Sequence, residues 1–366
     1  MPRVYLTLLL LTMAPLATLA AEKPNTLSPK EIEEGWILLF DGETNFGWIT
    51  EGDVKFQEGR IEMGGPKKST LTTSAAFGPC DIKLEYYQQG NAKLIVGGAA
   101  PFVPHYEKKL LAWMPMKIMI NEKGLAGIIF TQTAMSTGVG KEKTPDSPQS
   151  PLRFEVEGED VFWIRSVKLL PKSTKPLFNG KDLTGWKIFE DPKRNASKWS
   201  VTKEGWLNVK NGPGDLQTEG KYGDFLLQFD CISNGKALNS GIFFRCIANE
   251  YQNGYEAQVQ NGYKDDDRTK PADFGTGAIY RRIAARKVVS NDMEWFTMTV
   301  LAHGNHIATW VNGYQTVDWT DDRPADDNPR KGSKVGAGHL SIQGHDPTTD
   351  LSFRNIRILE LVGAKK

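Results

Sequence analysis

An internal repeat is the feature that most constrains the fold of this chain. Residues 39–48 read LFDGETNFGW and residues 177–186 read LFNGKDLTGW, with the matching positions at identical spacing. Further matches follow in the same order, and each copy closes alike, with RSVKL at 165–169 and RNIRI at 354–358. A repeat of this kind indicates a tandem duplication, so we expect two copies of one domain.

The copies are expected to meet at the short polar linker 171–176. We therefore predict a linker at residues 21–35, a first copy at 36–171 and a second at 176–363. Residues 1–20 are typical of a signal peptide, because Arg3 precedes an apolar run that ends in small residues. The run is short for a membrane span and Pro15 interrupts it, so we expect export to the periplasm or the exterior without stable membrane insertion.

The second copy consists of short β-type segments separated by Gly, Asn and Asp. Asn312-Gly313 predicts a hairpin, because this pair supplies the positive φ angles of a type I′ turn. The pattern predicts an all-β protein of two tandem jelly-roll β-sandwiches, the first of them reduced. The expected strands of the second copy are 198–201, 206–209, 225–232, 241–246, 255–260, 278–280, 295–302, 306–311, 315–319, 339–343 and 350–361.

The strongest functional pattern is a polar strand face in the second copy. Glu256, Gln258 and Gln260 alternate with apolar residues, so a strand places all three on one face. The neighbouring run NSGIFFR at 239–245 ends in Arg245, which is expected to approach that row. A face with a carboxylate, amides and an Arg suits a hydroxyl-rich ligand, with carbohydrate as the first interpretation.

The first copy has no comparable pattern. Residues 90–98 stand where the 239–245 run should be, and no segment matches 255–260. We expect this copy to have kept the scaffold and lost the site.

Composition excludes several partners. Lys plus Arg number 45 against 44 Asp plus Glu, so no field favours nucleic acid or an anionic membrane. No Cys/His spacing matches a zinc site, the acidic stretch 264–268 fits a solvated loop better than a calcium site, and no cofactor is expected. Cys80, Cys231 and Cys246 are an odd number for an oxidising compartment, and a Cys231–Cys246 disulfide and three buried free thiols are both open.

Several motifs together resemble the 3-keto-disaccharide hydrolase family. They occur in order as LFNGKDLTGW (177–186), YGDF (222–225), NSGIFFR (239–245), GYEAQ (254–258), GAIY (277–280), Asn312-Gly313 and FRNIRI (353–358). The resemblance covers nearly all of 176–363 and, weakly, 36–170. It implies a concanavalin-like sandwich, export, and cleavage of glycosides already oxidised at C3. Residues 295–296 read Trp-Phe where the family often has Trp-Asn, and the tip 343–349 is longer than usual.

A ketone at C3 acidifies the proton on C2, so a positioned base removes it and the C1 substituent leaves by elimination, after which water adds back. Glu256 is the candidate base, against a solvent-facing strand carboxylate. His345 is the candidate acid or second base, against a solvated loop histidine.

Five further residues are candidates for substrate binding. Arg245 would stabilise an enolate or form a structural ion pair, and Tyr280 would donate to the carbonyl or pack. Gln258 would bind sugar hydroxyls or be an ordinary exposed strand residue. Asn239 would touch substrate or shape a turn, and Gln343 is a candidate from its place in the tip 343–349.

The sequence thus supports an exported hydrolase of 3-keto-glycosides with its site in the second copy. The alternatives are a lectin-like protein that binds carbohydrate without chemistry, and a scaffold that uses both sandwiches for protein contacts.

Overall fold

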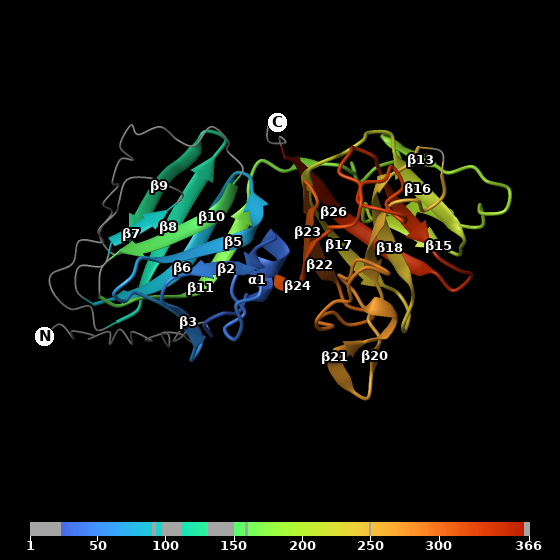
Figure 1. Cartoon of the computed structure of the whole chain (residues 1–366). Helices are drawn as coiled ribbons and strands as arrows, with labels where there is room; N and C mark the ends of the chain where they lie inside the picture. Colours follow the sequence, from blue (N-terminus) through green and yellow to red (C-terminus); the bar gives the residue numbers. More distant parts are fainter. Residues whose placement is uncertain are drawn as a thin grey trace, which may run out of the picture.

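The computed structural model describes residues 23–89, 93–96, 112–130, 150–157, 160–248 and 250–361. The predicted signal peptide lies outside these residues. The described chain is nearly all β, as the sequence predicts, and forms two β-sandwiches side by side (Figure 1). No helix in the described ranges is long and apolar enough to cross a membrane.

The first sandwich packs two antiparallel sheets face to face. One has the order β3-β4-β11-β6-β8-β9, with β1 also on β11, and the other the order β2-β5-β10-β7. The strands are β1 Ile37–Leu38, β2 Trp48–Glu51, β3 Val54–Gln57, β4 Arg60–Met63, β5 Ser69–Phe77, β6 Cys80–Gln88, β7 Lys93–Val96, β8 Met114–Asn121, β9 Gly124–Phe130, β10 Ser150–Glu157 and β11 Phe162–Pro171.

The second sandwich repeats this arrangement and extends it. Its sheets have the orders β14-β15-β26-β17-β22-β23-β24, with β12 on β26, and β13-β16-β25-β18-β19. The strands are β12 Lys175–Pro176, β13 Trp186–Ile188, β14 Lys198–Val201, β15 Leu207–Lys210, β16 Gly214–Thr218, β17 Phe225–Ser233, β18 Ser240–Cys246, β19 Tyr255–Val259, β20 Tyr263–Lys264, β21 Asp267–Pro271, β22 Phe296–His303, β23 His306–Val311, β24 Tyr314–Thr320, β25 His339–Gly344 and β26 Asp350–Glu360. A 3-10 turn, η1, spans Ala272–Phe274.

Matching the two sheet orders shows what distinguishes the copies. β2, β5, β10 and β7 correspond in order to β13, β16, β25 and β18, but within the described residues of the first copy no strand follows β7 in the position of β19. β19 carries Glu256 and Gln258. The small β20–β21 hairpin, which projects at the bottom of Figure 1, also belongs to the second copy alone among the described strands.

The predicted Asn-Gly hairpin is confirmed. Val311 pairs with Tyr314, and Asn312 and Gly313 have φ angles of 48° and 79°. The expected linker contains one short helix, α1, Pro29–Glu34, which begins with a Ser28–Glu31 capping box. Glu31 also forms an ion pair with Lys168 of β11 over 2.8 Å, so α1 is fixed to the first sandwich.

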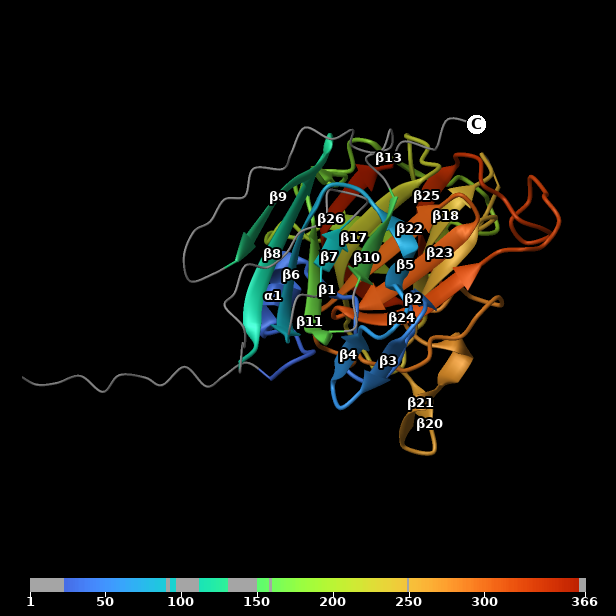
Figure 2. The same cartoon turned by 60° about the vertical axis from the view of Figure 1, so that its left-hand side comes forward.

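The two sandwiches share one apolar cluster rather than meeting through a polar linker. β22 and β23 are apolar on both faces: Met298 and Ile307 face the core of the second copy, whereas Leu301 and Trp310 join the core of the first. Trp310 donates from Nε1 to the Leu38 carbonyl at 3.0 Å. In the rotated view of Figure 2 the first copy covers the β22–β23 sheet, on the opposite side from β18.

The three cysteines settle the question left open by the sequence. Cys80, Cys231 and Cys246 are all buried and free, so the considered Cys231–Cys246 disulfide is not formed. Burial raises the pKa of each thiol, that of Cys80 to about 12. They therefore pack as small apolar side chains.

Candidate functional site

The outer face of the β16-β25-β18-β19 sheet is polar, although its inner face is core. Alternation places Glu256 and Gln258 outward and Ala257 inward, as the sequence predicts. Gly241 on β18 pairs with Gln258, and a Cβ at this position would lie 2.8 Å from Glu256 Oε1. The glycine therefore provides the space that the Glu256 carboxyl occupies.

Two adjoining cavities open above this face. The first, which we call the arginine cavity, has about 250 Å³. The second, the amide cavity, has about 270 Å³. Both are lined by Glu256, Tyr280, Arg281 and Arg330; the arginine cavity adds Phe243, Gly254, Tyr255, Arg282 and Pro329, and the amide cavity adds Arg194, Pro213, Asn239, Tyr251, Gln252, Gln258, Gln343 and His345.

Glu256 stands at the junction in an unusual state. Glu256 is only 6% exposed, and no group in the described parts of the chain donates a hydrogen bond to its carboxyl. Burial raises its pKa to about 8, and the neighbouring Asp273 and Asp215 carboxylates add to this, while Arg330 and Arg281 oppose it. The carboxyl is therefore mainly protonated at neutral pH and becomes a base just above it.

This pKa shift predicts a pH-dependent stability effect of Glu256→Gln. The folded state holds the proton up to about pH 8 while the unfolded chain releases it near 4.5, so the group destabilises the fold as pH rises through that window. The variant should gain stability relative to wild type between pH 5 and pH 9, by on the order of 4 kcal/mol at most. Urea titrations at both pH values measure this.

The exposed Glu219 provides the control, since Glu219→Gln should show no such pH-dependent difference. A Glu256→Gln difference that stays constant from pH 5 to pH 9 would contradict the assigned ionisation.

The amide cavity is named for the side chains that form its floor. Gln258 and Gln343 are 1% and 4% exposed, and the Oε1 atoms of both are buried without a hydrogen-bond partner in the described structure. Gln258 Nε2 donates to Asn239 Oδ1 at 3.4 Å and to Asp273 Oδ2 at 3.1 Å. Both oxygens are hydrogen-bond acceptors, and an unpaired buried oxygen is costly.

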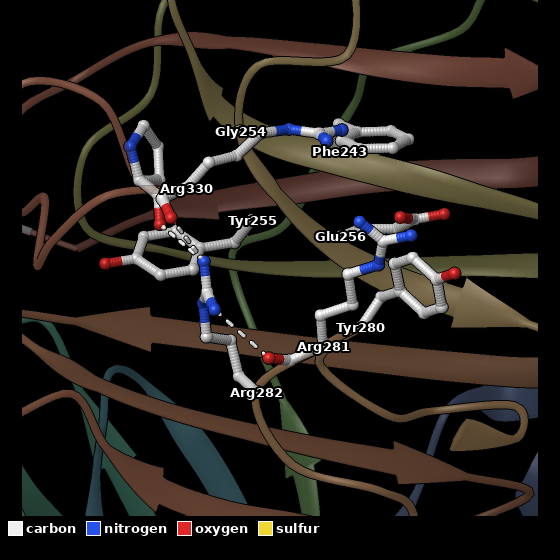
Figure 3. A pocket seen from close by; sticks show the side chains of 9 residues that line it. Phe243, Gly254, Tyr255, Glu256, Tyr280, Arg281, Arg282 and Arg330 are labelled. Atoms are coloured by element: carbon white, nitrogen blue, oxygen red, sulfur yellow. Dashed lines mark hydrogen bonds between the residues drawn. The ribbon is translucent and has the colours of Figure 1, made fainter. Parts of the chain in front are cut away.

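The loop after η1 brings Tyr280 and Arg281 over the site. Gly277 N donates to the Gln258 carbonyl at 2.9 Å and Tyr280 N to the Glu256 carbonyl at 2.9 Å, so the loop is bonded along the free edge of β19. Arg281 has a φ angle of 57° and no hydrogen bond from its guanidinium within the described residues. Tyr280 and Arg281 both extend toward Glu256 (Figure 3).

Arg282 and Arg330 close the arginine cavity from the other side. Arg282 Nη2 donates to the Arg330 carbonyl at 2.7 Å and Nη1 to the Arg281 carbonyl at 3.1 Å, as the dashed lines of Figure 3 show. Arg330 Nε donates to the Gln252 carbonyl at 2.9 Å. Sequence reasoning missed both residues, because Arg330 lies in a loop far from β19 along the chain, and Arg282 follows the motif at 277–280 without belonging to it.

His345 lies at the rim of the amide cavity, directly after β25. A hydrogen bond of 2.8 Å joins its Nδ1 to Asp346 Oδ2. Partial burial works to raise the pKa of Asp346, but hydrogen bonds from Thr348 and His345 outweigh this and lower it. Asp346 thus orients the ring and leaves Nε2 as the atom available to a substrate.

Arg245 is placed away from both cavities, contrary to the expected approach to the Glu/Gln row. A β-bulge lies between Phe243 and Cys246, and Arg245 has a φ angle of 53°, so the alternation that directs Phe243 to the site ends there. Its guanidinium is fully buried, donates to the Gly223 and Lys334 carbonyls and forms an ion pair with Asp224 at 3.0 Å. The geometry favours the structural alternative.

Asp215 is a second buried carboxyl that sequence reasoning missed. It lies on β16 opposite Gln343 and is fully buried. Burial raises its pKa to about 6, although hydrogen bonds from Gln252 act in the opposite direction. Arg194 lies 4.1 Å over the ring of Tyr251 at the edge of the amide cavity. The alternation of Asp215 and Gln217 would have indicated a second polar strand face. The segment 214–218, however, has too few β-branched residues to predict a strand.

In the described residues, no group of three or more His, Cys, Asp or Glu is arranged to hold a metal ion.

A jelly-roll sandwich whose outer sheet carries a buried carboxyl and amides, with guanidinium groups on the adjoining loops, is typical of a carbohydrate-active β-sandwich domain. More narrowly, the chain belongs to the 3-keto-alpha-glucoside-1,2-lyase-like domain family, whose model matches residues 173–359. The resemblance identified in the sequence is thereby confirmed.

Solved structures that are similar to this chain cover about half of it. Two structures of a candidate glycosyl hydrolase from Parabacteroides distasonis are 24% and 26% identical, each with a TM-score of 0.41, covering 52% of this chain and 94% and 100% of theirs. The carbohydrate-binding module CBM66 from Bacillus subtilis is 18% identical with a TM-score of 0.34, covering 47% of this chain and 93% of its own. No curated protein matches the chain.

Proposed function

We propose that the second copy cleaves 3-keto-glycosides by elimination, with Glu256 as the base. The observation that carries the proposal is Glu256 itself: a buried carboxyl that accepts no hydrogen bond from the described residues, has a pKa of about 8 and lies at the junction of two cavities. Such a carboxylate is a stronger base than an ordinary one, and a general base removes a proton from carbon most effectively when its pKa lies near the working pH.

The cavities suggest how the substrate lies. The oxidised ring would occupy the arginine cavity, where Arg281 and Tyr280 donate to the C3 oxygen as it becomes an enolate. The leaving sugar would occupy the amide cavity, where Gln258 Oε1 and Gln343 Oε1 accept from its hydroxyls.

The proposed reaction balances without a cofactor. Glu256 takes the C2 proton, the C1–O bond breaks, and the leaving oxygen takes a proton from Nε2 of His345 in its imidazolium form, which leaves the neutral ring with its Nδ1 proton hydrogen-bonded to Asp346. The products are the free sugar and an unsaturated 3-keto sugar, to which water adds across C1 and C2. Ordinary glycosidases need two carboxylates flanking the bond, whereas here only Glu256 lines either cavity among the described carboxyl groups.

Substrate oxidation state tests this proposal. The full chain is incubated with a 3-keto-disaccharide and with its unoxidised parent, and free sugar is followed by chromatography. We expect release from the keto form alone, deuterium from heavy water at C2 of the product, and a kcat/KM that rises with pH up to about 8.

Cleavage of the unoxidised parent at a similar rate would contradict elimination. Saturable binding of the keto form without turnover would instead favour the lectin-like alternative.

Export is part of the proposal and rests on residues 1–20 alone. Fractionation of expressing cells, with intact-mass analysis of the protein, would show whether that segment is removed.

A further inference from the structure

The arginine cavity holds more positive charge than the proposed chemistry uses. Arg281, Arg282 and Arg330 line one space of about 250 Å³. None of the three forms an ion pair within the described parts of the chain. The one carboxyl that lines the same cavity is Glu256, which is mainly protonated at neutral pH.

The hydrogen bonds of these side chains do not neutralise them. Arg282 donates to the carbonyls of Arg281, Pro329 and Arg330. Arg330 donates to the Gln252 carbonyl. These acceptors are uncharged, so they hold the guanidinium groups in place and leave their charges uncompensated.

Asp321, the carboxylate that acts on Arg282, is already paired with another residue. It accepts hydrogen bonds from the Arg323 guanidinium at 2.8 and 2.7 Å, and another from Tyr255. The pKa of Arg282 is lowered, first by burial and then by repulsion from Arg323, with Asp321 opposing only in part. The cavity wall is thus a region of positive potential.

An enolate accounts for one negative charge, and only during the reaction. Three adjacent unpaired guanidinium groups in a small cavity repel one another in the resting protein, and a permanent anion on the ligand would relieve this. A space of about 250 Å³ lies just below the usual range for ligand pockets, about 300–1,000 Å³. It suits one sugar ring rather than a long polyanion.

We propose that the substrate is an acidic sugar: the oxidised ring in the arginine cavity bears an anionic group, a carboxylate or a sulfate, that binds Arg282 and Arg330. Arg281 then remains for the enolate. This inference rests on the proposed function for the reaction, but the charge arrangement that carries it is independent of that reaction. The planar fork of arginine suits both anions.

Three matched substrates test the inference. They are 3-keto-disaccharides that differ only at C6 of the oxidised ring, with a hydroxymethyl, a carboxylate or a sulfate ester. We expect kcat/KM for at least one anionic substrate to exceed that of the neutral one by about 10-fold or more. Comparing the carboxylate with the sulfate substrate then identifies which anionic group is preferred. Equal or higher kcat/KM for the neutral substrate would overturn the inference and leave the proposed function intact.

Variants at Arg330 show whether this side chain carries the preference. Arg330→Gln should reduce the acidic-to-neutral ratio about 10-fold, and Arg330→Lys should restore part of it. Because the ratio is taken within each variant, a general loss of active protein cancels. Lys203→Gln removes the same charge from a side chain 91% exposed outside the site and should leave the ratio unchanged. A ratio in Arg330→Gln equal to that of wild type would overturn the assignment.

Binding separates the two proposals. Calorimetry on Glu256→Gln, with unoxidised disaccharides carrying either the acidic or the neutral group, measures the preference without turnover. Tighter binding of the acid, weakened by salt, supports the inference even if no keto substrate is cleaved. Equal binding of both would overturn it.

Discussion

Replacing Glu256 with Gln should reduce kcat/KM on a 3-keto-disaccharide by about 10³-fold or more. Gln keeps the size and most of the packing of the side chain but cannot take a proton from C2, and a positioned base typically contributes 10²–10⁴-fold. The loss should lie in kcat rather than KM, because the sugar contacts in the amide cavity remain. Steady-state kinetics with the keto substrate measure both constants.

The matched control adds Gln258→Glu to Glu256→Gln. This double variant keeps one carboxyl on the same face of the same strand but moves it by two residues, so it tests whether the position of the base matters. If Glu256→Gln retained near wild-type kcat, Glu256 would not be the base. Recovery of activity by the double variant would instead show that any carboxyl on this face suffices.

Replacing Trp310 with Ala should lower the free energy of unfolding by about 3–5 kcal/mol, the usual range for deleting a buried aromatic side chain. Trp310 is 1% exposed, packs against Phe77 of the first copy with 6.0 Å between ring centroids, and donates to the Leu38 carbonyl. Wild type should therefore unfold in one transition, whereas the variant should separate into two. Differential scanning calorimetry distinguishes these outcomes.

Val335→Ala is the control, because Val335 is 52% exposed and its truncation should change stability by no more than about 0.5 kcal/mol. Two transitions already present in wild type would contradict the shared core.

The elements predicted best from the sequence are those with local signals. Period-2 alternation alone placed Glu256 and Gln258 on one face, and the Asn312-Gly313 pair fixed its hairpin. The repeat predicted two similar sandwiches, because the same motifs begin and end each copy. These features depend on residues close together in the chain.

What the sequence did not predict depends on tertiary contacts. A β-bulge turns Arg245 into the protein, and the sequence does not reveal it, because a bulge inserts one residue without requiring a particular residue type. Arg330 reaches the site through a loop that contacts Gln252, 78 residues away. Asp215 lies on a strand stabilised by its neighbours β13 and β25 rather than by its own propensity.

The backbone bonds between the Tyr280 loop and the edge of β19 have a consequence for the kinetics of the site. A loop that moved aside to admit substrate would have to break the bonds from Gly277 and Tyr280 to the strand that carries Glu256. Under the proposed function, the backbone of the donor Tyr280 and that of the base Glu256 are thus bonded together before the sugar arrives, so assembling the site adds little cost to binding. We then expect turnover to be limited by proton transfer or product release rather than by the closing of this loop.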